Sequence, residues 1–247
     1  MRVAECFVAS NTSVARGYKH LVLGGCSLGR VDPGQFVMVK VDGHEVLLRR
    51  PFTVYDYDEE RGVLEILYKV TGRGTRAMAE LRESDVVSVL GPLGRGFPLD
   101  CPGKALLLAR GVGLASLTYL GKKLREAGCS VVTVGSFRGR GEDLATGNKL
   151  VEGFSSRVYV LYDEDGTSSL DNVRRVLFEE DPSAVYTCGS KRLIRLLKQT
   201  PFKAYASVEE RMGCGLGACL SCVVRTVHGY KLACRDGPVF DVRELEV

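Results

Sequence analysis

The stretch Glu210-Arg-Met-Gly-Cys-Gly-Leu-Gly-Ala-Cys-Leu-Ser-Cys222, together with Cys234, forms a C-x4-C-x2-C-x11-C pattern. The C-x4-C-x2-C core is the plant-type iron-sulfur spacing, in which one tight loop supplies three thiolates and a separate segment supplies the fourth. Glycines at 213, 215 and 217 allow positive φ angles and bring backbone N–H groups close to inorganic sulfide. We therefore predict a 2Fe-2S cluster, and hence electron transfer. Its ligands would be Cys214, Cys219, Cys222 and Cys234.

Two other uses of cysteine fit this spacing less well. Structural zinc sites usually pair their ligands as C-x2-4-C twice, whereas Cys234 stands alone. Disulfides are disfavoured because nine cysteines are an odd number and no secretory segment precedes them. The remaining cysteines are scattered among apolar residues, and we interpret them as small buried side chains. They are Cys6, Cys26, Cys101, Cys129 and Cys188.

Length and composition describe a globular chain larger than a cysteine-bearing module alone. The 247 residues suffice for two ordinary domains and a small module, and a hydrophobic content of 45% can form a substantial core. The net charge is +4 and the arginines are dispersed, so we expect no nucleic-acid binding. The longest aliphatic run, 105–109, is too short for a membrane span, and the N-terminus lacks the apolar core of a signal peptide. We therefore expect a cytoplasmic protein that does not enter a membrane.

Residues 1–98 have the pattern of a small antiparallel β-barrel. Alternating and β-branched runs at 35–41 and 62–70 are separated by turns rich in Gly, Pro and Asp. One helix, from Thr75 to Leu81, is predicted to interrupt them.

Residues 99–203 have a different pattern of predicted secondary structure. Predicted strands at 104–109, 130–135, 157–162 and 184–187 alternate with helices at 114–127, 169–179 and 190–199. Such alternation indicates a parallel sheet with helices on its faces. From 204 to 247 the alternation ends and the cysteine-bearing module begins. The predicted fold class is thus an N-terminal antiparallel β-barrel, a parallel α/β nucleotide-binding domain and a small C-terminal 2Fe-2S module.

Two segments of the barrel suit a flavin. Arg50-Pro-Phe-Thr53 offers an arginine for phosphate, a fixed proline φ, an aromatic ring for a flat heterocycle and a hydroxyl for a ring nitrogen. Further on, Tyr68-Lys-Val-Thr-Gly-Arg-Gly-Thr75 places a glycine-rich turn before the predicted helix, where N–H groups can receive a pyrophosphate. A solvated turn in the first segment and a hairpin-to-helix turn in the second remain the alternatives.

The α/β region carries a partial dinucleotide fingerprint. Ala109-Arg-Gly-Val-Gly113 joins a predicted strand to a helix, which is where a parallel sheet binds a dinucleotide. The fingerprint lacks a third glycine, and Arg110 adds bulk to the turn. No acidic residue follows the next strand, since residues 136–140 carry two arginines instead. Cys188 and Gly189 mark a second strand end on the same edge of the sheet.

The order of these parts resembles the ferredoxin-NADP reductase superfamily and, more narrowly, the electron-transfer subunits of type B dihydroorotate dehydrogenases. The resemblance covers essentially the whole chain. Its most specific stretches are Glu210 to Cys222 and Cys234-Arg-Asp-Gly-Pro-Val-Phe240. Gly91-Pro-Leu-Gly-Arg-Gly-Phe97 also matches the family's link between domains.

The resemblance implies FAD as a cofactor, with Thr53 near the flavin N5. The positions that match the family's FAD contacts are Arg50, Pro51, Phe52, Thr53, Leu67, Tyr68, Lys69, Gly74 and Thr75. It also implies NAD as a co-substrate, with contacts at Gly111, Gly113, Cys188 and Gly189.

The resemblance further implies a partner. In this family an FMN-containing catalytic subunit oxidises dihydroorotate to orotate in pyrimidine biosynthesis, and electrons pass through the 2Fe-2S cluster to FAD and then to NAD. The two kinds of subunit form a heterotetramer. The present chain would therefore conduct electrons and contribute no acid or base to dihydroorotate. Leu216, Leu220 and Val239 are candidate partner contacts, with packing inside the module as the alternative.

The chain departs from the family pattern at the expected NAD site. The family usually has Gly-Gly-Gly-x-Gly with a following Ala-Pro, and Cys-Gly-Pro at the second strand end, whereas Arg110, Ser116 and Ser190 interrupt these motifs here. Arg110 would either occlude the nicotinamide pocket or pair with a phosphate. We predict that FAD and cluster binding are retained while NAD use is weakened or replaced by another acceptor.

Two other functions remain open at this point. The first is a flavin and iron-sulfur reductase subunit that serves a different redox complex. The second is a zinc-stabilised interaction subunit without redox activity. A visible spectrum separates the second from the others, because a zinc protein is colourless whereas a flavin and an iron-sulfur cluster absorb blue light.

Overall fold

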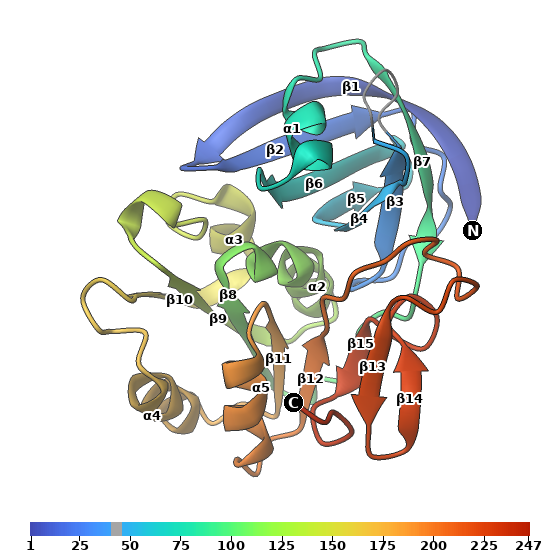
Figure 1. Ribbon diagram of the computed structural model, residues 1–247. Coiled ribbons are helices and arrows are strands. Elements are labelled where there is room, and N and C mark those ends of the chain that lie inside the picture. Colours follow the sequence, from blue (N-terminus) through green and yellow to red (C-terminus); the bar gives the residue numbers. More distant parts are fainter. Residues whose placement is uncertain (41–45) are drawn as a thin grey trace.

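The computed structural model describes residues 1–40 and 46–247. Figure 1 shows a strongly curved antiparallel sheet packed against a parallel α/β layer, with a small cysteine-bearing module beside that layer. The predicted fold class is confirmed.

The N-terminal sheet has seven antiparallel strands in the order β4-β3-β7-β1-β2-β6-β5. Alternate residues of its first strand, such as Ala4, Cys6 and Val8, are buried in the barrel core, as period-two patterning requires. The predicted strands at 35–41 and 62–70 are present as β3 and β6, although Val41 lies outside the described residues. The elements of this part are β1 (Arg2–Ala15), β2 (Tyr18–Gly24), β3 (Phe36–Lys40), β4 (Arg50–Thr53), β5 (Asp56–Asp58), β6 (Val63–Lys69), α1 (Arg73–Ala79) and β7 (Val86–Leu93).

Helix α1 begins earlier than the predicted start at Thr75. The Thr75 hydroxyl accepts hydrogen bonds from the backbone N–H groups of Thr71 at 2.8 Å and Gly72 at 3.0 Å. Thr75 therefore lies inside the first turn and reaches back to satisfy donors before it, while Gly72 takes the N-cap position.

The second sheet has the order β10-β9-β8-β11-β12-β15, in which the first five strands are parallel and β15 is antiparallel. Helices α2 and α3 cover one face, and α4 and α5 cover the other (Figure 1). The elements are β8 (Lys104–Arg110), η1 (Gly111–Gly113), α2 (Leu114–Glu126), β9 (Ser130–Phe137), η2 (Arg140–Glu142), α3 (Lys149–Phe154), β10 (Ser155–Tyr162), α4 (Leu170–Glu180), β11 (Ala184–Cys188), α5 (Lys191–Lys198), β12 (Ala204–Ser207) and β15 (Val239–Asp241).

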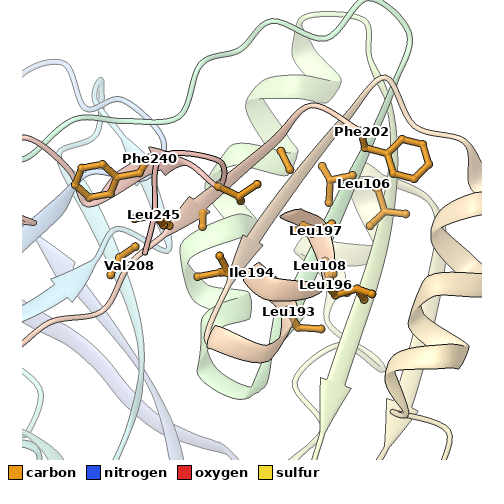
Figure 2. Close-up of a cluster of buried hydrophobic side chains, with 14 of the residues drawn as sticks. Leu106, Leu108, Leu193, Ile194, Leu196, Leu197, Phe202, Val208, Phe240 and Leu245 are labelled. Carbon is orange, nitrogen blue, oxygen red and sulfur yellow. The ribbon is translucent and has the colours of Figure 1, made fainter. Parts of the chain in front are cut away.

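The cysteine-bearing module packs directly on this sheet. Its hairpin consists of β13 (Val223–Thr226) and β14 (Gly229–Leu232), and the chain enters the module after β12 and returns to the sheet as β15. Val224 and Leu232 of the hairpin belong to the same buried cluster as Leu106 and Leu108 of β8. Figure 2 shows part of this cluster, with the leucines of α5 packed against β8. The divisions after residues 98 and 203 stay predictions.

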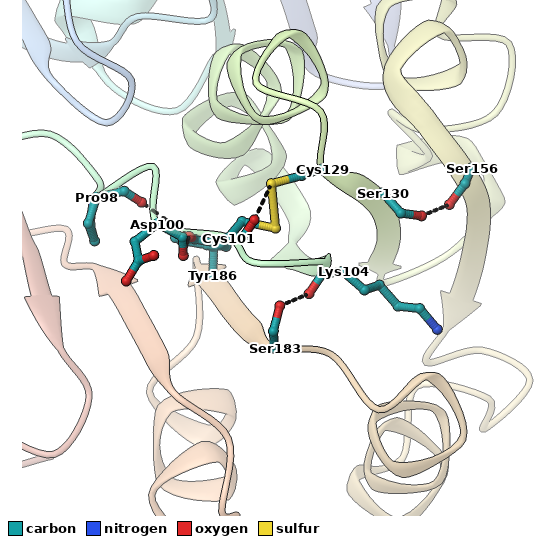
Figure 3. Close-up of a disulfide and its surroundings, with 9 residues drawn as sticks. All are labelled: Pro98, Asp100, Cys101, Lys104, Cys129, Ser130, Ser156, Ser183 and Tyr186. Carbon is teal, nitrogen blue, oxygen red and sulfur yellow. Dashed lines mark hydrogen bonds between the residues drawn. A yellow bond between two sulfur atoms is a disulfide. The ribbon is translucent and has the colours of Figure 1, made fainter.

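Four cysteines that we interpreted as free buried side chains form two disulfides instead. Antiparallel pairing of β1 with β2 places Phe7 opposite Gly24, so Cys6 and Cys26 meet with a Cα–Cα distance of 5.1 Å. Cys101 and Cys129 each precede one of the adjacent parallel strands β8 and β9, and their Cα atoms are 6.1 Å apart (Figure 3). Both distances suit a disulfide. Cys6, Cys26 and Cys129 are buried as expected. The expectation that the four cysteines are unpaired was wrong, because strand pairing, not sequence spacing, brings them together.

Candidate flavin and iron-sulfur site

The four predicted cluster ligands converge on one loop and one turn. Cys214, Cys219 and Cys222 lie in the loop before β13, and Cys234 follows β14. Backbone N–H groups point at their sulfurs, with Gly217 N 3.1 Å from Cys234 Sγ and Leu216 N 3.3 Å from Cys214 Sγ. Positive φ angles at Gly215 (73°) and Gly217 (81°) allow the loop to curve around the sulfurs in this way. The loop therefore has the N–H-lined concavity that an iron-sulfur cluster requires.

The sulfurs gather as two pairs. Cys222 Sγ and Cys234 Sγ are 3.2 Å apart, while the backbone N–H groups of Cys214 and Cys219 each lie 3.4 Å from the other's Sγ. Within residues 1–40 and 46–247, no three His, Cys, Asp or Glu side chains are grouped around a point for one metal ion. The contact between Cys222 and Cys234 and the mutual N–H contacts of Cys214 and Cys219 match the arrangement of two thiolates at each iron of a 2Fe-2S core.

Two of the four thiols, Cys219 and Cys234, differ in their electrostatics. The Ser221 hydroxyl, 3.2 Å from Cys219 Sγ, lowers the pKa of Cys219 to about 6, with help from backbone N–H groups. Burial raises the pKa of Cys234 to about 11. Because iron binds thiolates, loading the site releases protons, and Cys234 resists ionisation more than Cys219 does.

A cavity of about 380 Å³ lies between the barrel, the α/β layer and the segment leading to the cysteine loop. Seven of the nine residues predicted to contact FAD line it, and they come from β4, from β6 and from the first turn of α1. They are Pro51, Phe52, Thr53, Leu67, Tyr68, Lys69 and Thr75. On the opposite wall, Met212 stands two positions before Cys214. The cavity and the cysteine loop are therefore neighbours in space and in sequence.

The other two predicted FAD residues, Arg50 and Gly74, pack on each other beside the cavity. A methyl group at Gly74 would meet Arg50 Nε at 2.6 Å, so only glycine leaves room for this arginine. Arg50 Nη1 donates a hydrogen bond to the Leu48 carbonyl at 2.7 Å. The guanidinium is thus held beside the N-terminal turn of α1, the position expected for a phosphate contact.

Two residues of the cavity wall bear on ligand binding. The Thr53 hydroxyl oxygen is buried and has no hydrogen-bond partner among the described residues, which fits a ligand that supplies one. Lys69 instead turns toward the α/β layer, where its Nζ donates to Glu142 Oε2 at 2.9 Å and lies 4.8 Å from the centre of the Tyr18 ring. Lys69 therefore also joins the two halves of the molecule.

The four residues predicted to contact a dinucleotide are brought together at one edge of the sheet. Strands β8 and β11 are neighbours, with Ala109 opposite Cys188, and the loops that follow them touch. A Cβ atom added at Gly113 would lie 2.3 Å from the carbonyl oxygen of Cys188. A Cβ atom added at Gly189, where φ is +94°, would lie 2.2 Å from the carbonyl oxygen of Arg110. The glycines at 113 and 189 thus allow two backbones to pack without side chains between them.

Arg110 takes part in a hydrogen-bond network at the carboxyl ends of the strands. It is not among the residues lining the cavity, and its guanidinium lies across the carboxyl ends of three strands. There it donates to Ser136 Oγ at 2.8 Å and the Phe137 carbonyl at 3.3 Å, and it pairs with Asp163. The pair lowers the pKa of the Asp163 carboxyl. An acidic residue thus follows β10 and not β9, and Arg110 pairs with it.

Two family models match the chain. Residues 209–246 match the iron-sulfur cluster binding domain of dihydroorotate dehydrogenase B, and residues 25–97 match the oxidoreductase FAD-binding domain. The chain is 35% identical to the dihydroorotate dehydrogenase B (NAD(+)) electron transfer subunit of Listeria monocytogenes, over all of both chains. It is 34% identical to the subunit of that name from Bacillus cereus strain B4264, over 99% of each.

The chain belongs to the family of dihydroorotate dehydrogenase B electron transfer subunits. The predicted resemblance is thus confirmed, as is the expectation of an oxidoreductase subunit for electron transfer with a FAD-binding domain and an iron-sulfur domain.

Solved structures share the fold of this dihydroorotate dehydrogenase B family member. The structure of the NADH-dependent reduced ferredoxin-NADP oxidoreductase aligns with a TM-score of 0.86 and 26% identity, covering 98% of this chain and 89% of the other. Phthalate dioxygenase reductase aligns with a TM-score of 0.69 and 20% identity, covering 91% and 87%. The second likeness shows the fold alone.

Sequence reasoning missed several polar residues around the site of this family member. Asp163 directly follows the strand β10. Ligands bind at the carboxyl ends of parallel strands, which is the reason that we singled out Gly111, and the same reasoning also applies to Asp163. Ser207, at the end of β12, and Glu209, just after it, line the cavity, and this strand was not predicted. Val239, one of three candidate partner contacts, is buried at 8% exposure, whereas Leu216 and Leu220 are 47% and 63% exposed. No helix in the described part of the chain is long and apolar enough to cross a membrane.

Proposed function

We propose that this chain carries electrons from an FMN-containing catalytic subunit, which oxidises dihydroorotate to orotate, through a 2Fe-2S cluster to FAD and on to NAD or another acceptor. Cys214, Cys219, Cys222 and Cys234 would hold the cluster. The observation that carries the proposal is the adjacency of the cysteine loop and the cavity, joined by Met212. The names of the Listeria and Bacillus relatives support the partner and the acceptor.

The residues of the cavity have separate tasks in this proposal. Pro51 and Phe52 would hold the flat ring, Thr53 would offer its unpartnered hydroxyl to it, and Arg50 beside Gly74 would bind phosphate. A bound flavin accepts electrons singly and releases them in pairs, which is the chemistry needed between a one-electron cluster and a two-electron acceptor. The loops at Gly111, Gly113, Cys188 and Gly189 would receive the acceptor's dinucleotide.

The partner would dock beside the cysteine loop. Leu216, Leu220 and Val223 are exposed there, at 47%, 63% and 41%, on or next to the loop that holds three of the four sulfurs. A catalytic subunit seated on this surface would cover apolar side chains and bring its own cofactor close to the cluster. We include in the proposal a heterotetramer of two subunits of each kind and a cytoplasmic location.

One other function is favoured by a specific observation. The solved structure with a TM-score of 0.86 is named as an oxidoreductase of reduced ferredoxin and NADP that depends on NADH, and the Arg110–Asp163 pair departs from the expected NAD motif. A reductase subunit of a different redox complex therefore stays a candidate.

The experiment uses the chain purified together with its co-expressed catalytic subunit. We expect flavin and iron-sulfur absorption in this chain, and bleaching of both when dihydroorotate is added to the complex. A colourless chain would contradict cofactor binding altogether. A coloured complex that dihydroorotate does not bleach but reduced ferredoxin does would favour the other redox complex.

A further inference from the structure

A second cavity, of about 490 Å³, lies between the barrel and the α/β layer beside the flavin cavity. One of its walls consists of residues from β1, β2 and β6 together with Tyr55, and the other is the segment from Asp143 to Leu150 at the start of α3. Leu67 lines both cavities, but none of the other residues predicted to contact FAD or a dinucleotide lines the second one. The second cavity is therefore separate from the flavin and dinucleotide sites.

The walls of this cavity suit a flat ring. The rings of His20 and Tyr55 meet edge to face, with centroids 5.4 Å apart and an angle of 70° between their planes. Burial raises the pKa of Tyr55 to about 12, so its phenol is neutral, and the Asn148 side chain donates a hydrogen bond to it at 2.9 Å. A planar heterocycle can stack on either ring and be covered by aliphatic side chains. These are Val14, Leu67, Leu144 and Leu150.

Two carboxylates give this lining the character of a hydrogen-bond acceptor. The Oε2 atom of Glu65 lies 2.7 Å from His20 Nε2, which leaves Oε1 to accept a hydrogen bond from a ligand. Burial opposes ionisation of Asp143, but hydrogen bonds from Thr146 and Tyr162 outweigh it and lower the pKa of the carboxyl. An amino group on a bound ring would donate to Glu65, whereas a carbonyl at the same place would be repelled by its oxygens.

The lining also carries a lysine. Lys149 is exposed, and it forms no ion pair with any residue in the part of the chain that the structure describes. An ammonium group of this kind can bind a phosphate as a point charge. The cavity thus combines a slot for a flat ring, an acceptor for an amino group and a cation for an anionic group.

We propose that the second cavity binds a nucleotide whose base carries an amino group, such as cytosine or adenine. The amino group donates to Glu65, the base stacks on His20 or Tyr55, and the phosphate contacts Lys149. Because Leu67 lines both cavities, a nucleotide bound here alters the surroundings of the flavin without reacting with it. The inference goes beyond the proposed function, since neither the cluster nor the catalytic subunit takes part in this binding.

The test uses the FAD-loaded chain, so that added nucleotides cannot enter the flavin cavity. CMP is compared with UMP, and AMP with IMP, because the members of each pair differ by an amino group in place of a carbonyl. By titration calorimetry we expect CMP or AMP to bind about 10-fold more tightly than its partner. Glu65→Gln should abolish this preference, because an amide donates as well as accepts. Glu5→Gln, at an exposed glutamate of β1 that lines neither cavity, is the matched control and should retain the preference.

Two further readouts do not depend on Glu65. Lys149→Ala should weaken nucleotide binding about threefold at low salt and leave the binding of cytidine or adenosine unchanged. In the wild type, bound nucleotide should shift the absorption spectrum of the flavin.

Four results would overturn the inference: no binding of CMP or AMP, equal affinities within both pairs, equal nucleotide affinity in Lys149→Ala, or binding that Glu65→Gln leaves unchanged. The last would place the nucleotide elsewhere, for example at the dinucleotide edge. Binding without a spectral shift would overturn the link to the flavin through Leu67. A chain that does not hold FAD counts against the proposed function, whereas calorimetry, which measures heat and not colour, still tests the second cavity.

Discussion

Arg110 and Asp163 form a two-point ion pair across the carboxyl ends of β8 and β10. Arg110 Nη1 donates to Asp163 Oδ1 at 3.0 Å, and Nη2 contacts Oδ2. This pair lies on the sheet edge where a parallel α/β domain binds dinucleotides, at a position where the family pattern has glycine. Any dinucleotide bound there must lie beside the pair or displace it.

Replacing Arg110 by Gly should therefore open this edge. We expect NADH to reduce the flavin about tenfold faster than in the wild type, because no ion pair then has to be displaced. Stopped-flow absorbance with NADH and NADPH measures the rate. Arg157→Ala removes an arginine from the opposite end of β10 and is the control. A wild type that NADH already reduces as fast as the variant would contradict weakened NAD use.

Gly74→Ala should lower FAD affinity without touching FAD directly. The new methyl group would meet Arg50 Nε at 2.6 Å and push the guanidinium away. Arg50→Ala should have a similar effect, about 2 kcal/mol for loss of a charge-assisted phosphate contact, and the double variant should lose little more. Flavin fluorescence during dilution measures the affinity. Gly72→Ala is the matched control, since a methyl group there would meet no atom of the described residues within 4 Å.

Cys219→Ser should remove the iron-sulfur cluster while FAD stays bound. The hydroxyl that replaces the thiol does not ionise near neutral pH, and Cys219 is the ligand whose pKa Ser221 lowers to about 6. Iron content and the visible spectrum measure the loss. The buried Cys188 provides the control, because Cys188→Ser leaves all four ligands in place. Loss of both cofactors in Cys219→Ser would show that the loop, which packs on Met38 of the barrel, also maintains the flavin site.

Removing the disulfide between Cys101 and Cys129 should lower stability. The bond closes a loop with a sequence separation of 28, and opening such a loop costs roughly 3 kcal/mol. Cys101→Ser and the double variant with Cys129→Ser should therefore lower the thermal midpoint equally, and intact-mass spectrometry without reductant should show the bond only in the wild type. A wild type in which both thiols react with an alkylating agent after unfolding would contradict the disulfide.

The Lys69–Glu142 contact should make stability depend on pH in acid. The hydrogen bond from Lys69 lowers the pKa of Glu142 from 4.5, so the folded chain binds this proton more weakly than the unfolded chain. The stabilisation is therefore present above pH 4.5 and is lost as the pH falls below it. Glu142→Gln should cost about 0.5 to 1 kcal/mol at neutral pH and nothing in strong acid, as measured by thermal unfolding.

Local patterns in the sequence were enough for much of the fold and for the cluster site. The cysteine spacing, the glycines between the cysteines and the Arg50–Thr53 segment act over a few residues, where covalent geometry limits what the chain can do. Regular alternation likewise predicted β3, β6 and most of the α/β elements. The short strand β12 was missed because four residues carry too little periodicity to be recognised.

The sequence by itself determined the kinds of chemistry present: four thiolates in an iron-sulfur spacing, a flavin-binding motif and a strand-to-helix turn for a dinucleotide. Only the tertiary structure decided which distant residues meet these groups. Arg110 meets Asp163, Glu209 meets Cys188 and Cys6 meets Cys26 because strand order and register set distances in space independently of separation along the chain. These contacts determine how the side chains ionise and which strands are covalently linked. They therefore affect the chemistry of the motifs that the sequence encodes.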